Sequence, residues 1–216
     1  MKLLSSGSHS IAWFKLADFV SRGEKERALS IYRLLVHSIA DKAFAHQLEG
    51  DILLAFDDYV AIEHYHLAAN LYKKEHDYQK AIAVYKHVVL VKKDLKALEA
   101  ILDIHDHLKD QIGMIHSFSQ FAILAVQLKD FGTLINRLHL YLMTKNDIIK
   151  AELYGYTFFA LALHDQENPQ IEMYLTQALD LYLKCGDSSL LTQFMSKLEV
   201  SHELFYKVAQ EILLKI

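Results

Sequence analysis

The sequence predicts an all-α protein built from helical hairpins, and three observations lead to this fold class. Apolar residues recur at helical spacing along most of the chain, whereas strict alternation of apolar and polar residues is hard to find. The 216 residues include one proline and seven glycines, so few positions interrupt a helix. Residues that cap helices precede one apolar segment after another. With 52% hydrophobic residues, the chain can bury a sizeable core.

The first two helices are expected at residues 8–22 and 24–40, where apolar residues such as Tyr32 and Leu35 recur with helical spacing. Each later helix is expected to start at a residue that can cap it: Asp41, Asp58, Asp77, Asp94, Asp110, Asp130, Asp147, Asn168, Asp187 and Ser201. These side chains accept hydrogen bonds from the free N–H groups of a first helical turn, and aspartate also complements the helix dipole. Pro169 is expected at a first helical position, where its missing N–H costs nothing.

Alternate helix starts are evenly spaced. Asp41 and Asp77 are 36 residues apart, and so are Asp58 and Asp94. A unit of two helices, roughly 33 to 40 residues long, is therefore repeated about six times. Since one hairpin is too small to bury its own apolar face, neighbouring hairpins must stack. We therefore expect one repeat domain over residues 1–216.

A short phrase also recurs within the helices, in which an alanine is followed four residues later by a tyrosine. It begins at Ala28, Ala61, Ala81 and Ala178. Helices approach to about 8–10 Å only where small side chains lie at the crossing. The aromatic residue then fills the gap between one hairpin and the next. The phrase therefore predicts buried contacts between neighbouring helices.

These residues resemble the tetratricopeptide repeat family, and residues 64–93 match best. There the small and aromatic positions of both helices are occupied by Ala69, Tyr72, Ala81, Tyr85 and Val88, on either side of the turn "EHDYQKA". A further match runs through Ala17, Gly23 and Ala28. The similarity extends over about residues 8–128, and residues 130–200 are degenerate repeats. It implies a right-handed superhelical α-solenoid of about six antiparallel hairpins. The segment "AIEHYHLAANLYKKEHDYQKAIAVY" is also similar to SNAP-type adaptors.

The resemblance implies a concave face that is lined by the first helix of each hairpin and binds a peptide or a partner helix. The residues expected on this face are Glu63, His66, Asn70, Lys73, Lys74, Lys96, Asp103, Asp106 and His107. Asn70 and Lys73 resemble the residues with which some family members bind a C-terminal carboxylate. Asp103 and Asp106 are expected to repel an acidic tail. An ordinary hydrated helix face is the other interpretation of this set.

Composition disfavours several classes of protein. The net charge of −4 gives no general attraction to nucleic acid. A single cysteine, Cys185, excludes an intramolecular disulfide framework and fits a reducing compartment. No apolar run approaches the roughly 20 residues that span a bilayer. We therefore expect a cytoplasmic protein without a membrane span and without a nucleic-acid partner.

Thirteen histidines raise the question of a metal site. His64 and His66 are two residues apart on a helix and point in different directions, so this pair cannot chelate one ion. Glu63 and His66 have the spacing of a di-metal carboxylate bundle, but such a bundle needs a second pair and further inward glutamates. Phosphate-binding loops and nucleophile motifs are not found in the sequence. The sequence therefore predicts no metal, no cofactor and no enzyme.

The predicted function is a non-catalytic scaffold, adaptor or chaperone that binds a protein segment in its groove. The last helix, residues 201–216, carries an apolar stripe that includes Leu204, Phe205, Val208 and Ile212. This helix is expected either to fold back as a cap or to dock on another subunit or partner. The alternative function is therefore a structural subunit that self-associates through residues 201–216.

Overall fold

The computed structural model describes residues 6–215, and every regular element within them is helical. The α-helices are α1 (Ser6–Ser21), α2 (Lys25–Leu35), α3 (Lys42–Leu54), α4 (Ala61–Lys74), α5 (Tyr78–Val91), α6 (Leu95–His107), α7 (Gln111–Gln127), α8 (Phe131–Thr144), α9 (Asp147–His164), α10 (Ile171–Cys185), α11 (Ser188–Ser201) and α12 (Glu203–Leu213). A short 3₁₀-helix, Val36–Ser38, follows α2 and ends the second expected helix early. The prediction of an all-α fold is confirmed, and twelve helices agree with about six hairpins.

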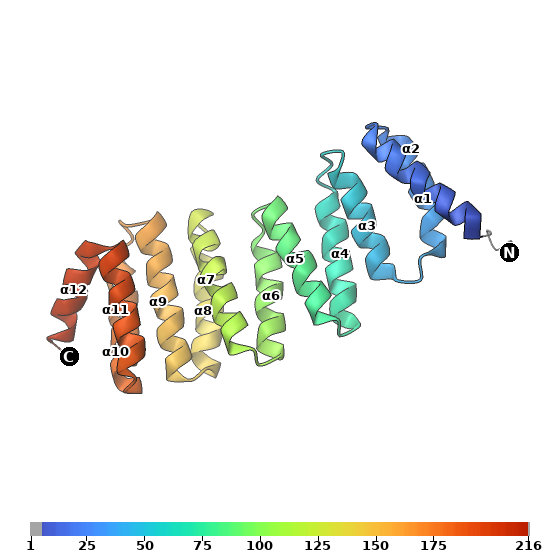
Figure 1. Ribbon diagram of the computed structural model, residues 1–216. Helices are drawn as coiled ribbons and strands as arrows, with labels where there is room; N and C mark the ends of the chain where they lie inside the picture. Colours follow the sequence, from blue (N-terminus) through green and yellow to red (C-terminus); the bar gives the residue numbers. More distant parts are fainter. Residues whose placement is uncertain (1–5, 216) are drawn as a thin grey trace. The chain divides into compact units, whose positions relative to one another are not determined.

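The chain forms two compact units, residues 1–97 (unit 1) and 98–216 (unit 2). In unit 1, each helix from α1 to α5 packs against the next one along the chain (Figure 1). In unit 2, consecutive helices from α7 to α12 pack in the same way, and α7 also contacts α9. Packing between sequential neighbours is the arrangement of an α-solenoid. The right-handed sense and the single repeat domain stay predictions. None of the described helices is long and apolar enough to cross a membrane.

Aspartate caps begin six of the twelve described α-helices, at positions that the sequence predicts. The side chains that accept a hydrogen bond from a backbone N–H in the first turn are Asp41, Asp77, Asp94, Asp110, Asp130 and Asp187. At the start of α3, for example, the N–H of Phe44 donates to Asp41 Oδ1 over 2.8 Å. These bonds satisfy N–H groups that have no partner within the helix.

Two expected helix starts are wrong. Asp147 is the first residue of α9, and Asn146 is its cap, because Asn146 Oδ1 accepts the N–H of Ile149 over 3.0 Å. Ser201 is the last residue of α11, and its hydroxyl donates to the carbonyl of Lys197 over 2.6 Å. A serine hydroxyl that bonds back to the preceding turn continues a helix and does not start a new one.

Asp58 and Asn168 begin turns that lead into their helices. The Oδ1 of Asn168 accepts the N–H of Gln170 over 3.0 Å, and α10 starts one residue later. Pro169 therefore lies in the turn before α10, and the prediction that it is the first helical residue is wrong. Asp58 bonds the N–H of Val60 in the same way, and α4 follows. Both are Asx-type turns, in which the side chain bonds the backbone two residues on.

The recurrent alanine phrase lies in the core of both units. The alanines Ala28, Ala61, Ala81 and Ala178 are all fully buried, as predicted. The tyrosines four residues after them, Tyr32, Tyr65, Tyr85 and Tyr182, are exposed by at most 3%. One match was wrong, because Ala17 is exposed and the adjacent Leu16 faces the core of unit 1.

Each of these four tyrosines ties its helix to a neighbouring one. The Tyr32 hydroxyl donates to the carbonyl of Ala45 (2.8 Å), and the Tyr65 hydroxyl donates to Asp51 (2.8 Å). The Tyr85 hydroxyl donates to Asn70 (2.9 Å), and the Tyr182 hydroxyl donates to Glu152 (2.9 Å). Burial, together with nearby carboxylates, raises the pKa of Tyr32, Tyr65 and Tyr182. These hydroxyls therefore stay protonated and remain donors. The phrase thus supplies a directional bond as well as packing.

Helix α12 folds back onto unit 2, which is one of the two alternatives given by the sequence. It packs against α10 and α11, and the ring of Phe205 lies edge-on to Phe158 with their centres 5.2 Å apart. Leu204 stays 79% exposed, so part of the predicted apolar stripe is uncovered in this chain. The sequence also predicts Ile216 as part of this stripe, but that residue lies outside the described residues.

Candidate functional site

Five residues of the predicted partner-binding set lie on α4 in unit 1: Glu63, His66, Asn70, Lys73 and Lys74. Glu63, Asn70 and Lys74 are exposed, whereas His66 and Lys73 are half-buried. His66 Nε2 lies 3.1 Å from an oxygen of Asp94, and Asn70 accepts the hydroxyl proton of Tyr85. Two of the five side chains thus make contacts inside unit 1. The contacts of His66 and Asn70 help to hold α4 against its neighbours in unit 1.

Three residues of the set, Asp103, Asp106 and His107, lie on α6 in unit 2. Asp103 accepts a hydrogen bond from Arg137 of α8 over 2.6 Å, and Asp106 pairs with Lys145, which directly follows α8. Because both carboxylates are neutralised by cations, they repel an acidic partner less than the sequence suggested. Lys96, the remaining member, is exposed at the start of α6 and belongs to unit 1.

Arg137 is the centre of the ion pairs between α6 and α8. Its guanidinium bonds Asp103 and also lies 3.2 Å from an oxygen of Glu99. Burial alone would lower the pKa of Arg137, but the two carboxylates outweigh it and raise the pKa. The arginine side chain is 14% exposed, whereas Asp103 is 48% exposed. Solvent therefore screens these pairs, and we expect each to contribute about 1 kcal/mol.

Unit 1 contains an open cleft of about 570 Å³ between α3 and α5, with α4 as its floor. We call it the α3–α5 cleft, and its lining residues are Phe44, Gln47, Asp51, Tyr65, Tyr72, Lys80, Ala83, Val84 and His87. Its volume is in the range of ordinary ligand sites. No residue of the predicted set lines this cleft, because Tyr65 and Tyr72 project from a different side of α4 than Glu63 and Asn70. This cleft was not predicted from the sequence.

The α3–α5 cleft combines aromatic faces with charged groups. Lys80 Nζ lies 5.1 Å from the centre of the Tyr72 ring and 2.7 Å from an oxygen of Asp77. At the edge of the cleft Phe44 is 42% exposed, which is unusual for so large an apolar side chain. The cleft can therefore accept an apolar group and surround it with polar contacts.

A second cleft, of about 400 Å³, lies in unit 2 where α6 to α9 meet. Asp106 of the predicted set lines it, together with Lys145 and the capping residues Asp110 and Asn146. Since the Asp106 carboxylate pairs with Lys145 and Asp110 caps α7, the polar groups of this cleft are largely engaged with one another. It offers a partner fewer free contacts than the α3–α5 cleft.

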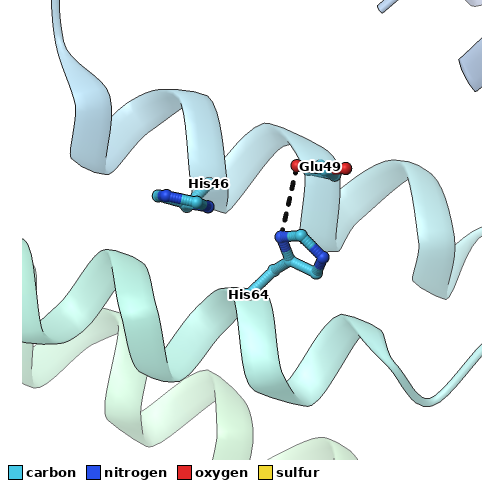
Figure 2. A group of neighbouring side chains, drawn as sticks. All are labelled: His46, Glu49 and His64. Atoms are coloured by element: carbon cyan, nitrogen blue, oxygen red, sulfur yellow. Dashed lines mark ion pairs between the residues drawn. The ribbon is translucent and has the colours of Figure 1, made fainter. Parts of the chain in front are cut away.

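Three side chains in unit 1 are placed where they could hold a metal ion. His46 and Glu49 come from α3 and His64 from α4, and each is half-buried (Figure 2). One ligand atom from each residue lies within 4.8 Å of the other two. This group was not predicted from the sequence, because the metal-binding pairs considered there lay on the helix of His64, whereas His46 and Glu49 are three residues apart on α3. The spacing of His46 and Glu49 was the available signal.

Comparison with protein-family models gives no match, and a search of curated proteins finds no significant similarity. The resemblance to tetratricopeptide repeats therefore stays a prediction.

Proposed function

We propose that the chain is a non-catalytic scaffold that binds a segment of a partner protein in the α3–α5 cleft. The observation that supports this most is the cleft itself, at whose edge Phe44 is half-exposed beside the buried rings of Tyr65 and Tyr72. Aromatic side chains carry much of the energy of protein interfaces, because they bury a large area with few rotatable bonds.

The polar groups around the cleft favour a segment with an apolar anchor. Asp51 already accepts the Tyr65 hydroxyl, and Lys80 is paired with Asp77. Lys80 is therefore neutralised by its partner, whereas the Asp51 carboxylate keeps its negative charge and disfavours an acidic ligand. An apolar side chain packed against Phe44, with a hydrogen bond to the amide of Gln47, fits these groups better. We place the anchor of the partner segment there.

Within unit 1, the proposed binding surface, the α3–α5 cleft, differs from the surface formed by the predicted set. Lys73 and Lys74 lie on α4 but do not line the cleft. The concave face implied by the family resemblance is therefore a competing surface, and one experiment can compare the two.

The test is site-specific photo-crosslinking in the native cell. A photoreactive amino acid replaces Ala83, which is exposed and lines the cleft, or Lys74, which represents the predicted set. We expect a defined protein adduct from position 83 that disappears when Phe44→Ser removes the aromatic edge. An adduct from position 74 alone would favour the predicted set, and none from either would contradict a scaffold function in unit 1.

Self-association through residues 201–216 is a second candidate, supported by the exposure of Leu204 and Leu214. They are 79% and 88% exposed, so both side chains are accessible to a second copy of the chain. If the chain self-associates there, Leu204→Lys together with Leu214→Lys should convert an oligomer to a monomer in light scattering. An unchanged molecular mass would exclude this interface.

A further inference from the structure

Two buried nitrogen atoms in the hairpin of α3 and α4 have no hydrogen-bond partner: Nδ1 of His46 and Nδ1 of His64. Glu49 Oε2 lies 3.2 Å from His64 Nδ1, but the contact lacks the direction of a hydrogen bond. The two imidazole rings are tilted by 38°, with their centres 5.7 Å apart. Buried polar atoms without a partner are uncommon in proteins, and a bound ion or water molecule is a usual explanation.

The local sequence brings these groups together. His46 and Glu49 are three residues apart on α3 and therefore share one face of that helix. The next residue, Gly50, allows α4 to approach closely, because a Cβ atom there would lie 2.8 Å from Cε1 of Tyr65. His64 precedes Tyr65, and its ring points toward Glu49 across the two helices (Figure 2).

We propose that His46, Glu49 and His64 bind a divalent transition-metal ion, and that Zn²⁺ is the ion that fits them. Two imidazoles and one carboxylate form a known ligand set for this ion, in which a water molecule occupies the remaining position. Zinc bonds of about 2.0–2.1 Å place ligand atoms about 3.4 Å apart. Since the three atoms already lie within 4.8 Å, rotations of the side chains are enough to close the site.

The surroundings suit a metal ligand in position 49. Tyr32 of α2 lies beside the Glu49 carboxylate, and its hydroxyl is fixed by a bond to the carbonyl of Ala45. A buried group beside a ligand restricts its movement, as the outer residues of metal sites do. The α3–α5 cleft is lined by other residues of α3, namely Phe44, Gln47 and Asp51. The proposed metal site is therefore separate from the proposed partner site.

This proposal departs from the expectation of no metal that was drawn from the sequence. That expectation came from pairs on one helix, whereas the three ligands are distributed over two helices. A water molecule held between the two histidines is the alternative explanation of the unpartnered nitrogens. Only the metal explanation requires all three side chains.

The experiment uses the full chain without a histidine tag, freed of metal by a chelator. Co²⁺ is titrated while its visible absorption is recorded, and Zn²⁺ is then added as a competitor. We expect one equivalent of Co²⁺ to give a d–d spectrum and Zn²⁺ to displace it. His64→Ala and Glu49→Gln should each weaken Co²⁺ binding more than about tenfold, since changes to outer-shell groups alone reach that level.

The matched control is a double variant, His116→Ala with His139→Ala. It removes two exposed histidines from unit 2 and leaves the proposed ligands intact. We expect its Co²⁺ affinity to equal that of the wild-type chain. Similar losses in the control and in Glu49→Gln would show non-specific binding to surface histidines and would overturn the proposal.

Circular dichroism and a thermal melt distinguish a loss of metal binding from a loss of folding. Glu49→Gln keeps the shape of the side chain, so its far-UV circular dichroism should match the wild type. Zn²⁺ should raise the Tm of the wild-type chain and of the control, but not that of Glu49→Gln, because a ligand stabilises only the state that binds it. An equal rise in Glu49→Gln, or no rise in the wild type, would contradict the site.

Discussion

The two units bury their helices with different chemistry. In unit 1, tyrosine hydroxyls of Tyr32, Tyr65 and Tyr85 reach backbone or side-chain oxygens of a neighbouring helix. In unit 2, Tyr182 makes the same kind of bond to Glu152, and a cluster of phenylalanines around Phe158 and ion pairs around Arg137 also lie between helices. Both units nevertheless pack each helix against its sequential neighbours.

One part of the repeat is common to both units. Fully buried alanines occur in both units at positions of the recurrent phrase, so close helix approach is common to them. The polar groups that accompany this approach differ from one hairpin to the next. The family resemblance weakens after residue 128, whereas packing between sequential helices continues there.

The largest effect is expected from Phe158→Ala in unit 2. Phe158 is fully buried and contacts the rings of Phe159, Phe194 and Phe205. Loss of the ring should lower the free energy of unfolding by about 3–5 kcal/mol through lost burial and a cavity. Hydrogen exchange followed by mass spectrometry should show faster exchange in α9 to α12. Equal acceleration in α1 to α4 would contradict the separation into two units.

Adding one methyl group at a helix crossing should have the next largest effect, and each unit offers a site. A Cβ at Gly50 would lie 2.8 Å from Tyr65, and one at Gly155 would lie 2.9 Å from Phe194. Overpacking of this kind costs about 1–3 kcal/mol, partly offset by about 1 kcal/mol of helix propensity. Gly50→Ala and Gly155→Ala should both lower the Tm. A higher Tm in either would show that its crossing is loose.

Breaking the ion pairs of unit 2 should cost less. Arg137→Leu leaves the partly exposed carboxylates of Glu99 and Asp103 without their cation. We expect a loss of about 1–2 kcal/mol in chemical denaturation at low salt. The difference from the wild type should shrink in 1 M salt, where screening is strong. A loss that does not depend on salt would indicate that Arg137 acts mainly through packing.

The smallest effect concerns acid stability in unit 1. Burial alone would raise the pKa of Asp94, but hydrogen bonds from His66 and the Ala97 N–H lower it below the usual 3.8. A carboxyl with a lowered pKa stabilises the fold above its unfolded pKa, and this stability is lost as the pH falls through the folded pKa. Asp94→Asn keeps a helix cap but cannot ionise. Its unfolding free energy should therefore fall less steeply than that of the wild type below about pH 4.

A matched change in unit 2 sharpens the acid prediction. The pKa of Asp110 is lowered mainly by the N–H of Gly113, and this side chain is 46% exposed. Asp110→Asn should therefore alter the acid slope less than Asp94→Asn does. A larger change for Asp110→Asn would mean that exposure does not determine how much each carboxylate contributes to acid stability.

The sequence predicted helix starts well because a cap is a local interaction. Asp41 and Asp77 act on N–H groups three residues ahead, within reach of the same turn. The predicted helix start at Asp147 was wrong because Asn and Asp are equally good caps, and Asn146, one residue earlier, is the cap. The predicted start at Ser201 was wrong because its hydroxyl donates to the carbonyl of the preceding turn instead of capping the next helix.

The candidate site was harder to predict because its contacts join distant residues. The sequence placed Asp103 on a polar face, but the pairing with Arg137 depends on how α6 and α8 align. The three proposed metal ligands likewise require the register of α3 against α4, which Gly50 and Tyr65 set by close contact. Periodicity places residues on a face of a helix, and it does not give the relative position of two helices.

The central claim is that the recurrent phrase fixes each helix on its neighbour through both packing and a directed hydrogen bond. A double-mutant cycle with Tyr65→Phe and Asp51→Ala measures this bond directly, because the hydroxyl of Tyr65 donates to Asp51 over 2.8 Å. We predict a coupling free energy of about 1–3 kcal/mol in chemical denaturation, as expected for a bond to a charged acceptor. A coupling below about 0.3 kcal/mol, within the error of additivity, would contradict the claim.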